Sequence, residues 1–172
     1  MTGHVPPSID GDLLSLYLSD HLTGATAGRS RIERMAGAYG EGELGPDLRR
    51  LAAQIGEEHT LLQDLIGELG LSRRPHRQAL AWLAEHAGRL KLNKRLLSTS
   101  PLTVVLELEL MRTAVVGKLG GWQTLVELAP ELDLDRSRFE TLVERAKDQA
   151  ATLERLHAQV RGPAFHVGQA PH

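Results

Sequence analysis

The sequence predicts an all-α protein of one domain, a bundle of four long helices. Aromatic residues make up 3% of its 172 residues, so Leu, Ala and Val must fill the interior, which suits closely packed helices better than sheets. Apolar residues recur at alternating steps of three and four, the period of a helix face. One segment, Leu102 to Trp122, is apolar on nearly every side and is expected to be covered all round.

The first predicted helix runs from residue 10 to about residue 38, after an irregular arm at residues 1–9 that contains two prolines. Asp10 or Ser8 caps its start. The glycines of the tract 24–28 lower helix propensity, so we expect a bulky or backbone neighbour to approach closely there. The inward stripe of this helix consists of Leu14, Leu18, His21, Ala25, Gly28, Ile32 and Met35.

The second predicted helix begins at Pro46, a residue suited to the first turn, and runs to Leu69, with Gly70 as its stop. Glu58 takes a place in its stripe where the pattern predicts an aliphatic residue. We therefore expect this carboxylate to point inward. The other members of the stripe are Leu48, Leu51, Ile55, Leu62, Leu65 and Leu69.

The connection between the second and third helices, residues 71–99, is far longer than the roughly two to eight residues usual in bundles. A helix of about 25 residues is roughly 37 Å long, so a segment of this size can return the chain to its starting end as a crossover. Pro75 is expected to open a shorter helix within it. The residues expected to pack that helix on the bundle are Ala79, Leu80, Trp82, Leu83, Ala87 and Leu90.

The third predicted helix starts at residue 101, with Ser100 as its cap, and ends before Pro130. The fourth is capped by Asp133, Asp135 or Ser137 and ends near residue 161, where a flexible tail of residues 162–172 begins. Its predicted inward stripe is Phe139, Val143, Ala146, Ala150, Leu153, His157 and Val160.

Four charged residues interrupt the apolar surface of the third helix. They are Glu107, Glu109, Arg112 and Lys118. Glu107 shares a face with Lys118, and Glu109 lies three residues before Arg112. We expect these charges to form ion pairs that fix the register of the helices. The alternative is that Glu107 or Glu109 turns toward His21 and Glu58.

Composition and charge exclude several classes of function. The chain contains no cysteine, which excludes disulfides, zinc–thiolate sites and cysteine nucleophiles. Its formal net charge of -2 and the lack of basic clusters with aromatics argue against a nucleic-acid partner. No signal peptide or membrane-spanning run is predicted, so we expect a cytoplasmic protein without a membrane partner.

Three stretches of the chain resemble the ferritin-like superfamily, and more narrowly an uncharacterised bacterial group of such bundles. They are YLSDHLTGATAG at residues 17–28, AWLAEHAGRLKLNKRL at 81–96 and SPLTVVLELELMRTAVVGK at 100–118. Four long helices with a crossover between the second and third is also the connectivity of that superfamily. The resemblance implies a ferritin-like four-helix bundle over residues 10–161, and it implies no activity.

Di-iron members of the superfamily place one Glu on each of two helices and Glu-x-x-His on the other two. Glu154 and His157 match this pattern in the fourth helix, whereas Gly56 stands three residues before His59 in the second. The candidate ligands for a di-iron or di-manganese centre are His21, Glu58, His59, Glu107, Glu109, Glu154 and His157.

Three functions are open to such a bundle. We expect first a non-catalytic protein without a cofactor, acting through its surface or as a homo-oligomer such as a dimer, because the second Glu-x-x-His is missing. The alternative is a di-metal carboxylate protein, using iron or manganese, with oxidoreductase or metal-handling activity. A third hypothesis is a carrier of a small ligand, held in a cavity beside residues 24–28 and 117–121, where side-chain volume is low.

Overall fold

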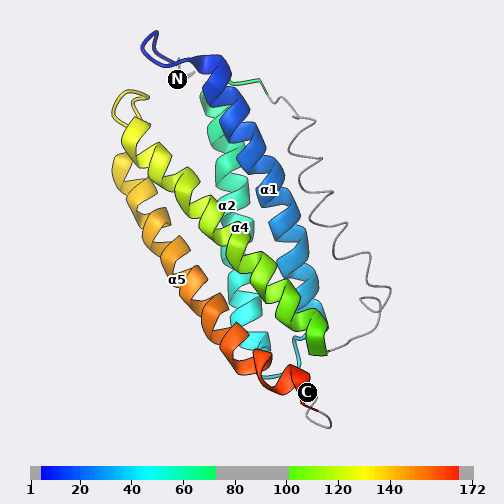
Figure 1. The fold of residues 1–172 in the computed structure, drawn as a ribbon. Helices are drawn as coiled ribbons and strands as arrows, with labels where there is room; N and C mark the ends of the chain where they lie inside the picture. The colour runs from blue at the N-terminus through cyan, green and yellow to red at the C-terminus, as the bar shows by residue number, and fades with distance from the viewer. Residues whose placement is uncertain (1–4, 73–100, 167–172) are drawn as a thin grey trace.

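A computed structural model of the chain describes residues 5–72 and 101–166, and this part of the chain is all-helical, without strands (Figure 1). The predicted all-α class is therefore confirmed. The helices are α1 (Gly11–Ala38), α2 (Gly45–Glu68), α4 (Pro101–Leu128), α5 (Arg136–Arg161) and the short 3-10 helix η1 (Pro163–Phe165).

Several sequence predictions lie outside the described residues. These are the crossover with its helix from Pro75 and that helix's packing residues, the cap at Ser100, the first four residues of the arm and the end of the tail. They stay predictions.

The helix ends follow their capping residues closely. The Asp10 carboxylate accepts hydrogen bonds from the backbone N–H groups of residues 12 and 13, which selects Asp10 over Ser8 as the cap of α1. Gly70, with φ 65°, follows α2 in the left-handed conformation that glycine adopts without cost. Asp135 caps α5, so Ser137 lies inside that helix and donates its hydroxyl to the Asp135 carboxylate at 2.7 Å.

The helices form two antiparallel pairs, α1 with α2 and α4 with α5 (Figure 1). The chain leaves α2 at the end of the bundle opposite to the one where α4 starts, so these two helices run parallel. The two pairs meet chiefly where α1 packs on α4, and this contact is less extensive than the contacts within the pairs. Room for a cavity is thus left between the pairs.

The apolar core is divided into two clusters, one in each half of the bundle. The first is built around Ile32, Met35, Leu48, Leu51, Leu108, Met111, Leu153 and Leu156. The second is built around Leu18, Leu62, Leu65, Trp122, Leu125, Phe139, Leu142 and Ala146. Polar residues occupy the level between them.

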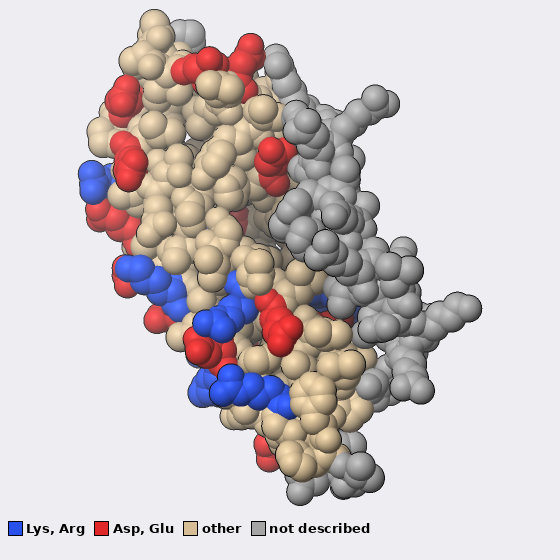
Figure 2. All heavy atoms as spheres, viewed as in Figure 1, with Lys and Arg blue, Asp and Glu red and all other residues tan. Residues whose placement is uncertain are grey.

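The prediction that α4 is covered all round is wrong for the described residues. Val116 is 53% exposed, and Thr113, Ala114 and Gly117 are also exposed. Figure 2 shows this face, where uncharged side chains form a broad area in the upper part and most Lys and Arg lie in the lower half. An apolar face of such small residues leaves little hydrophobic area in water, so its exposure costs less than that of a leucine face.

None of the described helices is long and apolar enough to cross a membrane.

Candidate functional site

Glu58, Lys118 and Gln149 occupy core positions at one level of three different helices, and we call them the polar layer. Each continues an apolar stripe spaced by three and four residues, so the helical period carries it inward. The stripes run Ile55, Glu58, Leu62 in α2, Val115, Lys118, Trp122 in α4, and Ala146, Gln149, Leu153 in α5. The polar layer separates the two apolar clusters.

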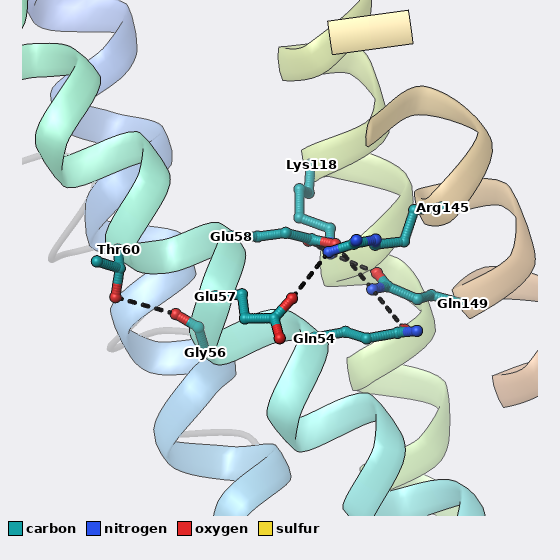
Figure 3. A network of polar contacts seen from close by, with 8 residues as sticks. All are labelled: Gln54, Gly56, Glu57, Glu58, Thr60, Lys118, Arg145 and Gln149. Atoms are coloured by element: carbon teal, nitrogen blue, oxygen red, sulfur yellow. Dashed lines mark hydrogen bonds and ion pairs between the residues drawn. The ribbon is translucent and has the colours of Figure 1, made fainter. Parts of the chain in front are cut away.

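The polar layer forms a closed ring of hydrogen bonds (Figure 3). The Lys118 ammonium donates to the Glu58 carboxylate and to the Gln149 side-chain oxygen. Gln149 Nε2 in turn donates to the other Glu58 oxygen at 2.9 Å and to Gln54 Oε1 at 3.1 Å. Every polar atom of Glu58, which is 2% exposed, therefore has a partner, as a buried carboxylate requires.

The surroundings of the Lys118 ammonium shift its pKa in opposite directions. Burial lowers its pKa below the ordinary value, and the Glu58 carboxylate opposes that shift. The Arg145 guanidinium lowers the pKa of Lys118 further, while itself bonded to Glu57 at 3.1 Å. The ammonium is thus held between two acceptors, and its charge compensates that of Glu58.

A cavity of about 760 Å³ lies between α1, α2 and α4, beside the polar layer. Its walls are mainly small or apolar residues, and it opens to solvent where lining residues such as Ala27, Thr113 and Gly117 are exposed. Lys118 and Glu58 also line it. This is the place where low side-chain volume predicted a cavity.

Among the described residues, no neighbour closely approaches the glycines of the tract 24–28, contrary to the prediction. A Cβ added at Gly24 or Gly28 would meet no described atom within 4 Å, because these positions face the cavity. The close approach occurs instead at Gly121 of α4. A Cβ there would lie 3.0 Å from the His21 ring.

Two buried polar atoms belong to residues of the cavity wall and have no hydrogen-bond partner within the described part of the chain. They are Asp20 Oδ1 and Trp122 Nε1. Trp122 is 3% exposed and stacks on Phe139, with 6.5 Å between the ring centroids. Since buried polar atoms are nearly always bonded, these two point to a ligand or to water in the cavity.

His21 is a half-buried imidazole of the cavity wall. Burial lowers its pKa below the ordinary value of 6.5, and Asp20 opposes this shift in part. The ring stands edge-on to Tyr17, with centroids 4.5 Å apart. The prediction that His21 belongs to the inward stripe of the first helix agrees with this position.

Glu107 lies away from the polar layer and pairs with α1 rather than with Lys118. Its carboxylate lies 3.4 Å from Arg31 and 3.5 Å from Arg34. The Tyr39 hydroxyl donates to it at 3.2 Å, and burial together with Glu107 raises the pKa of Tyr39 to about 12. The predicted pair of Glu107 with Lys118 does not form, because eleven helical residues span roughly 16 Å along the axis, which is too far for an ion pair.

Glu109 and Arg112 form no pair with each other, contrary to prediction. Glu109 lies 3.0 Å from His157 Nε2, and Arg112 lies 2.8 Å from Glu154. Both contacts join α4 to α5, because the neighbouring helix offers partners that the side chains reach more directly. The charges do form ion pairs between helices, but with other partners.

The seven candidate metal ligands are therefore dispersed. His21, Glu58 and His59 line the cavity, with His59 Nε2 3.0 Å from Thr26 Oγ1, whereas the other four lie elsewhere in the contacts given above. Among the described residues, no three His, Asp or Glu side chains form a group that could hold a metal ion. These donors do not fit a two-metal centre, and the iron or manganese alternative stays an untested prediction.

Sequence reasoning missed Asp20, Gln149 and the unpartnered indole of Trp122. The buried stripe of α5 is Phe139, Leu142, Ala146, Gln149, Leu153, Leu156 and Val160. It differs from the predicted stripe at three positions, where Leu142, Gln149 and Leu156 are buried instead of Val143, Ala150 and His157. The spacing alone would have found Gln149 if a polar core residue had been allowed.

No family model, curated protein or solved structure matches this chain. The cavity and the polar layer are therefore the features that bear on function.

Proposed function

We propose that this protein is a non-catalytic helical bundle that binds a small, largely apolar ligand in the cavity between α1, α2 and α4. The observation that supports this most directly is the cavity of about 760 Å³ together with the unpartnered, buried Nε1 of Trp122 in its wall. Ligand sites are typically cavities of roughly 300–1,000 Å³ with apolar walls and a few polar groups. The cavity has this size and this kind of wall.

The polar layer supports the same proposal. Its ring of hydrogen bonds joins α2, α4 and α5 beside the cavity, so these helices are held in one register. A preformed cavity binds a ligand without the cost of ordering its walls. Lys118 is engaged by two acceptors, which suits a structural role better than that of a nucleophile.

Filling the cavity should weaken binding. We expect the uncharged fluorescent probe N-phenyl-1-naphthylamine to bind the native protein at one saturable site. Gly24→Leu should weaken that binding at least about tenfold, because its side chain would occupy the space that the cavity now provides. A fluorescence titration measures both affinities.

Gly37→Leu is the matched control, since Gly37 lies in the same helix, is exposed and has no described atom near its Cβ position. It changes helix propensity by the same amount and should leave binding unchanged. Gly117→Leu fills the cavity from α4 and provides a second test should Gly24→Leu fold poorly. The absence of saturable binding, or equal affinity in all variants, would sink the proposal.

We also propose that two copies of the chain associate through α4. Between Arg112 and Glu127 this helix carries one charge, Lys118, which points into the bundle, so its exposed side around Val116 is uncharged. A small exposed residue such as Ala114 would allow a second α4 to approach closely. An unpartnered uncharged helix face of this kind is typical of a contact between subunits.

Sedimentation velocity at several concentrations tests the dimer. The native chain should sediment increasingly as a dimer as its concentration rises, and Val116→Glu should shift it to the monomer, because two carboxylates would be buried at the contact. Ala151→Glu, at an exposed position of α5, should leave the distribution unchanged. A native chain that is monomeric at every concentration refutes the dimer and leaves the cavity proposal standing.

We also propose that the chain is related to the ferritin-like superfamily. The three sequence stretches that resemble it and the parallel run of α2 and α4 support this relationship. Metal analysis of the protein purified without added metal tests the di-metal alternative. Stoichiometric iron or manganese would favour it over the non-catalytic bundle.

A further inference from the structure

The charges around the cavity define the ligand more closely, on the assumption that the cavity binds a ligand as proposed above. We propose that this ligand is an apolar amine whose ammonium group pairs with the Asp20 carboxylate. Asp20 forms no hydrogen bond or ion pair with any described residue, and its Oδ1 is buried in the cavity wall. A buried carboxylate oxygen without a donor is costly, and a ligand N–H group would supply one.

The other charged groups of the described wall already have partners. Lys118 is paired with Glu58, and Arg31 lies 3.4 Å from Glu107. The wall therefore carries one carboxylate, that of Asp20, whose charge no described cation compensates. A cationic ligand restores the balance, whereas an anionic one would add a second unpaired negative charge.

The side chains of His21, Tyr17 and Trp122 are also compatible with a cationic ligand. The lowered pKa of His21 keeps its imidazole mostly neutral at pH 7, so it does not serve as a strong counterion for Asp20. Tyr17 and Trp122 also line the cavity, and aromatic faces attract ammonium groups. The remaining wall is largely aliphatic or glycine and would hold the apolar body of the amine.

Three ligands with the same naphthalene ring system measure the contribution of the ammonium group to binding. Displacement of N-phenyl-1-naphthylamine is measured for 2-(aminomethyl)naphthalene, for 2-methylnaphthalene and for the corresponding naphthalenemethanol. The amine should bind at least about tenfold more tightly than the hydrocarbon, the difference expected for a hydrogen bond to a charged group. Equal affinity of amine and hydrocarbon in the native protein refutes the proposal without any variant.

Asp20→Asn should remove the preference for the amine and leave the affinity for 2-methylnaphthalene unchanged. Glu33→Gln is the matched control, since it removes a carboxylate from an exposed, Arg29-paired position of the same helix, outside the cavity wall. A preference that survives in Asp20→Asn overturns the proposal. An alcohol that binds as tightly as the amine overturns it as well, because a neutral donor would then suffice. If none of the three compounds binds, the cavity proposal itself fails; if only the amine preference is missing, the cavity proposal stands.

Discussion

Lys118→Met should lower the free energy of unfolding by about 3 kcal/mol or more, the cost of leaving a buried carboxylate without its cation. Glu58 is 2% exposed, and Lys118 is the cation bonded to it. Methionine keeps nearly the same length and apolar stem, so packing in the stripe of α4 is preserved. Urea denaturation followed by far-UV circular dichroism measures the change.

The double variant Glu58→Leu/Lys118→Met separates charge from packing. It removes both charges from the core, and replacing a buried ion pair by apolar residues is often neutral or stabilising. It should therefore recover most of the stability lost in Lys118→Met. Arg112→Met, which breaks an exposed pair with Glu154, is the control and should cost less than about 1 kcal/mol. If Lys118→Met and Arg112→Met cost the same, the ion pair of the polar layer does not stabilise the fold.

Gly121→Val should lower stability by about 2 kcal/mol, because its side chain would collide with the imidazole of His21 where α1 crosses α4. A Cβ at this position would lie 3.0 Å from His21 Cε1 and Nδ1, before the two methyl groups of valine are added. The collision separates α1 from α4 at the edge of the cavity. Thermal and urea unfolding measure the effect.

Gly120→Val offers a control one residue away. Its Cβ position has no described atom within 4 Å, so the same change in helix propensity occurs without the collision. This variant should be as stable as the native protein or slightly more so. His21→Ala should in turn relieve Gly121→Val by removing the ring that it strikes. Equal destabilisation by Gly120→Val and Gly121→Val would contradict this packing of α1 on α4.

The sequence predicted the helices and the inward position of Glu58 because both depend on local pattern. Capping by Asp10 and Asp135, the stop at Gly70 and the stripes of α1 and α2 are properties of residues close together in the chain. An acidic residue in an apolar stripe must point inward if the stripe does. The low volume around residues 24–28 and 117–121 likewise indicated empty space.

The partners of the charged side chains were decided only by the tertiary structure. Lys118 was expected to pair with Glu107 of its own helix, yet it bonds to Glu58 of α2 and Gln149 of α5. A stripe fixes the direction of a side chain around its own helix, but not which level of a neighbouring helix it meets. That level depends on how far the helices slide along one another, and the three side chains of the polar layer reach one another at one such register. The cavity is a similar case. The small residues of the sequence indicated that it exists, but only the packing of α1 on α4 determined that Asp20 and Trp122 belong to its wall.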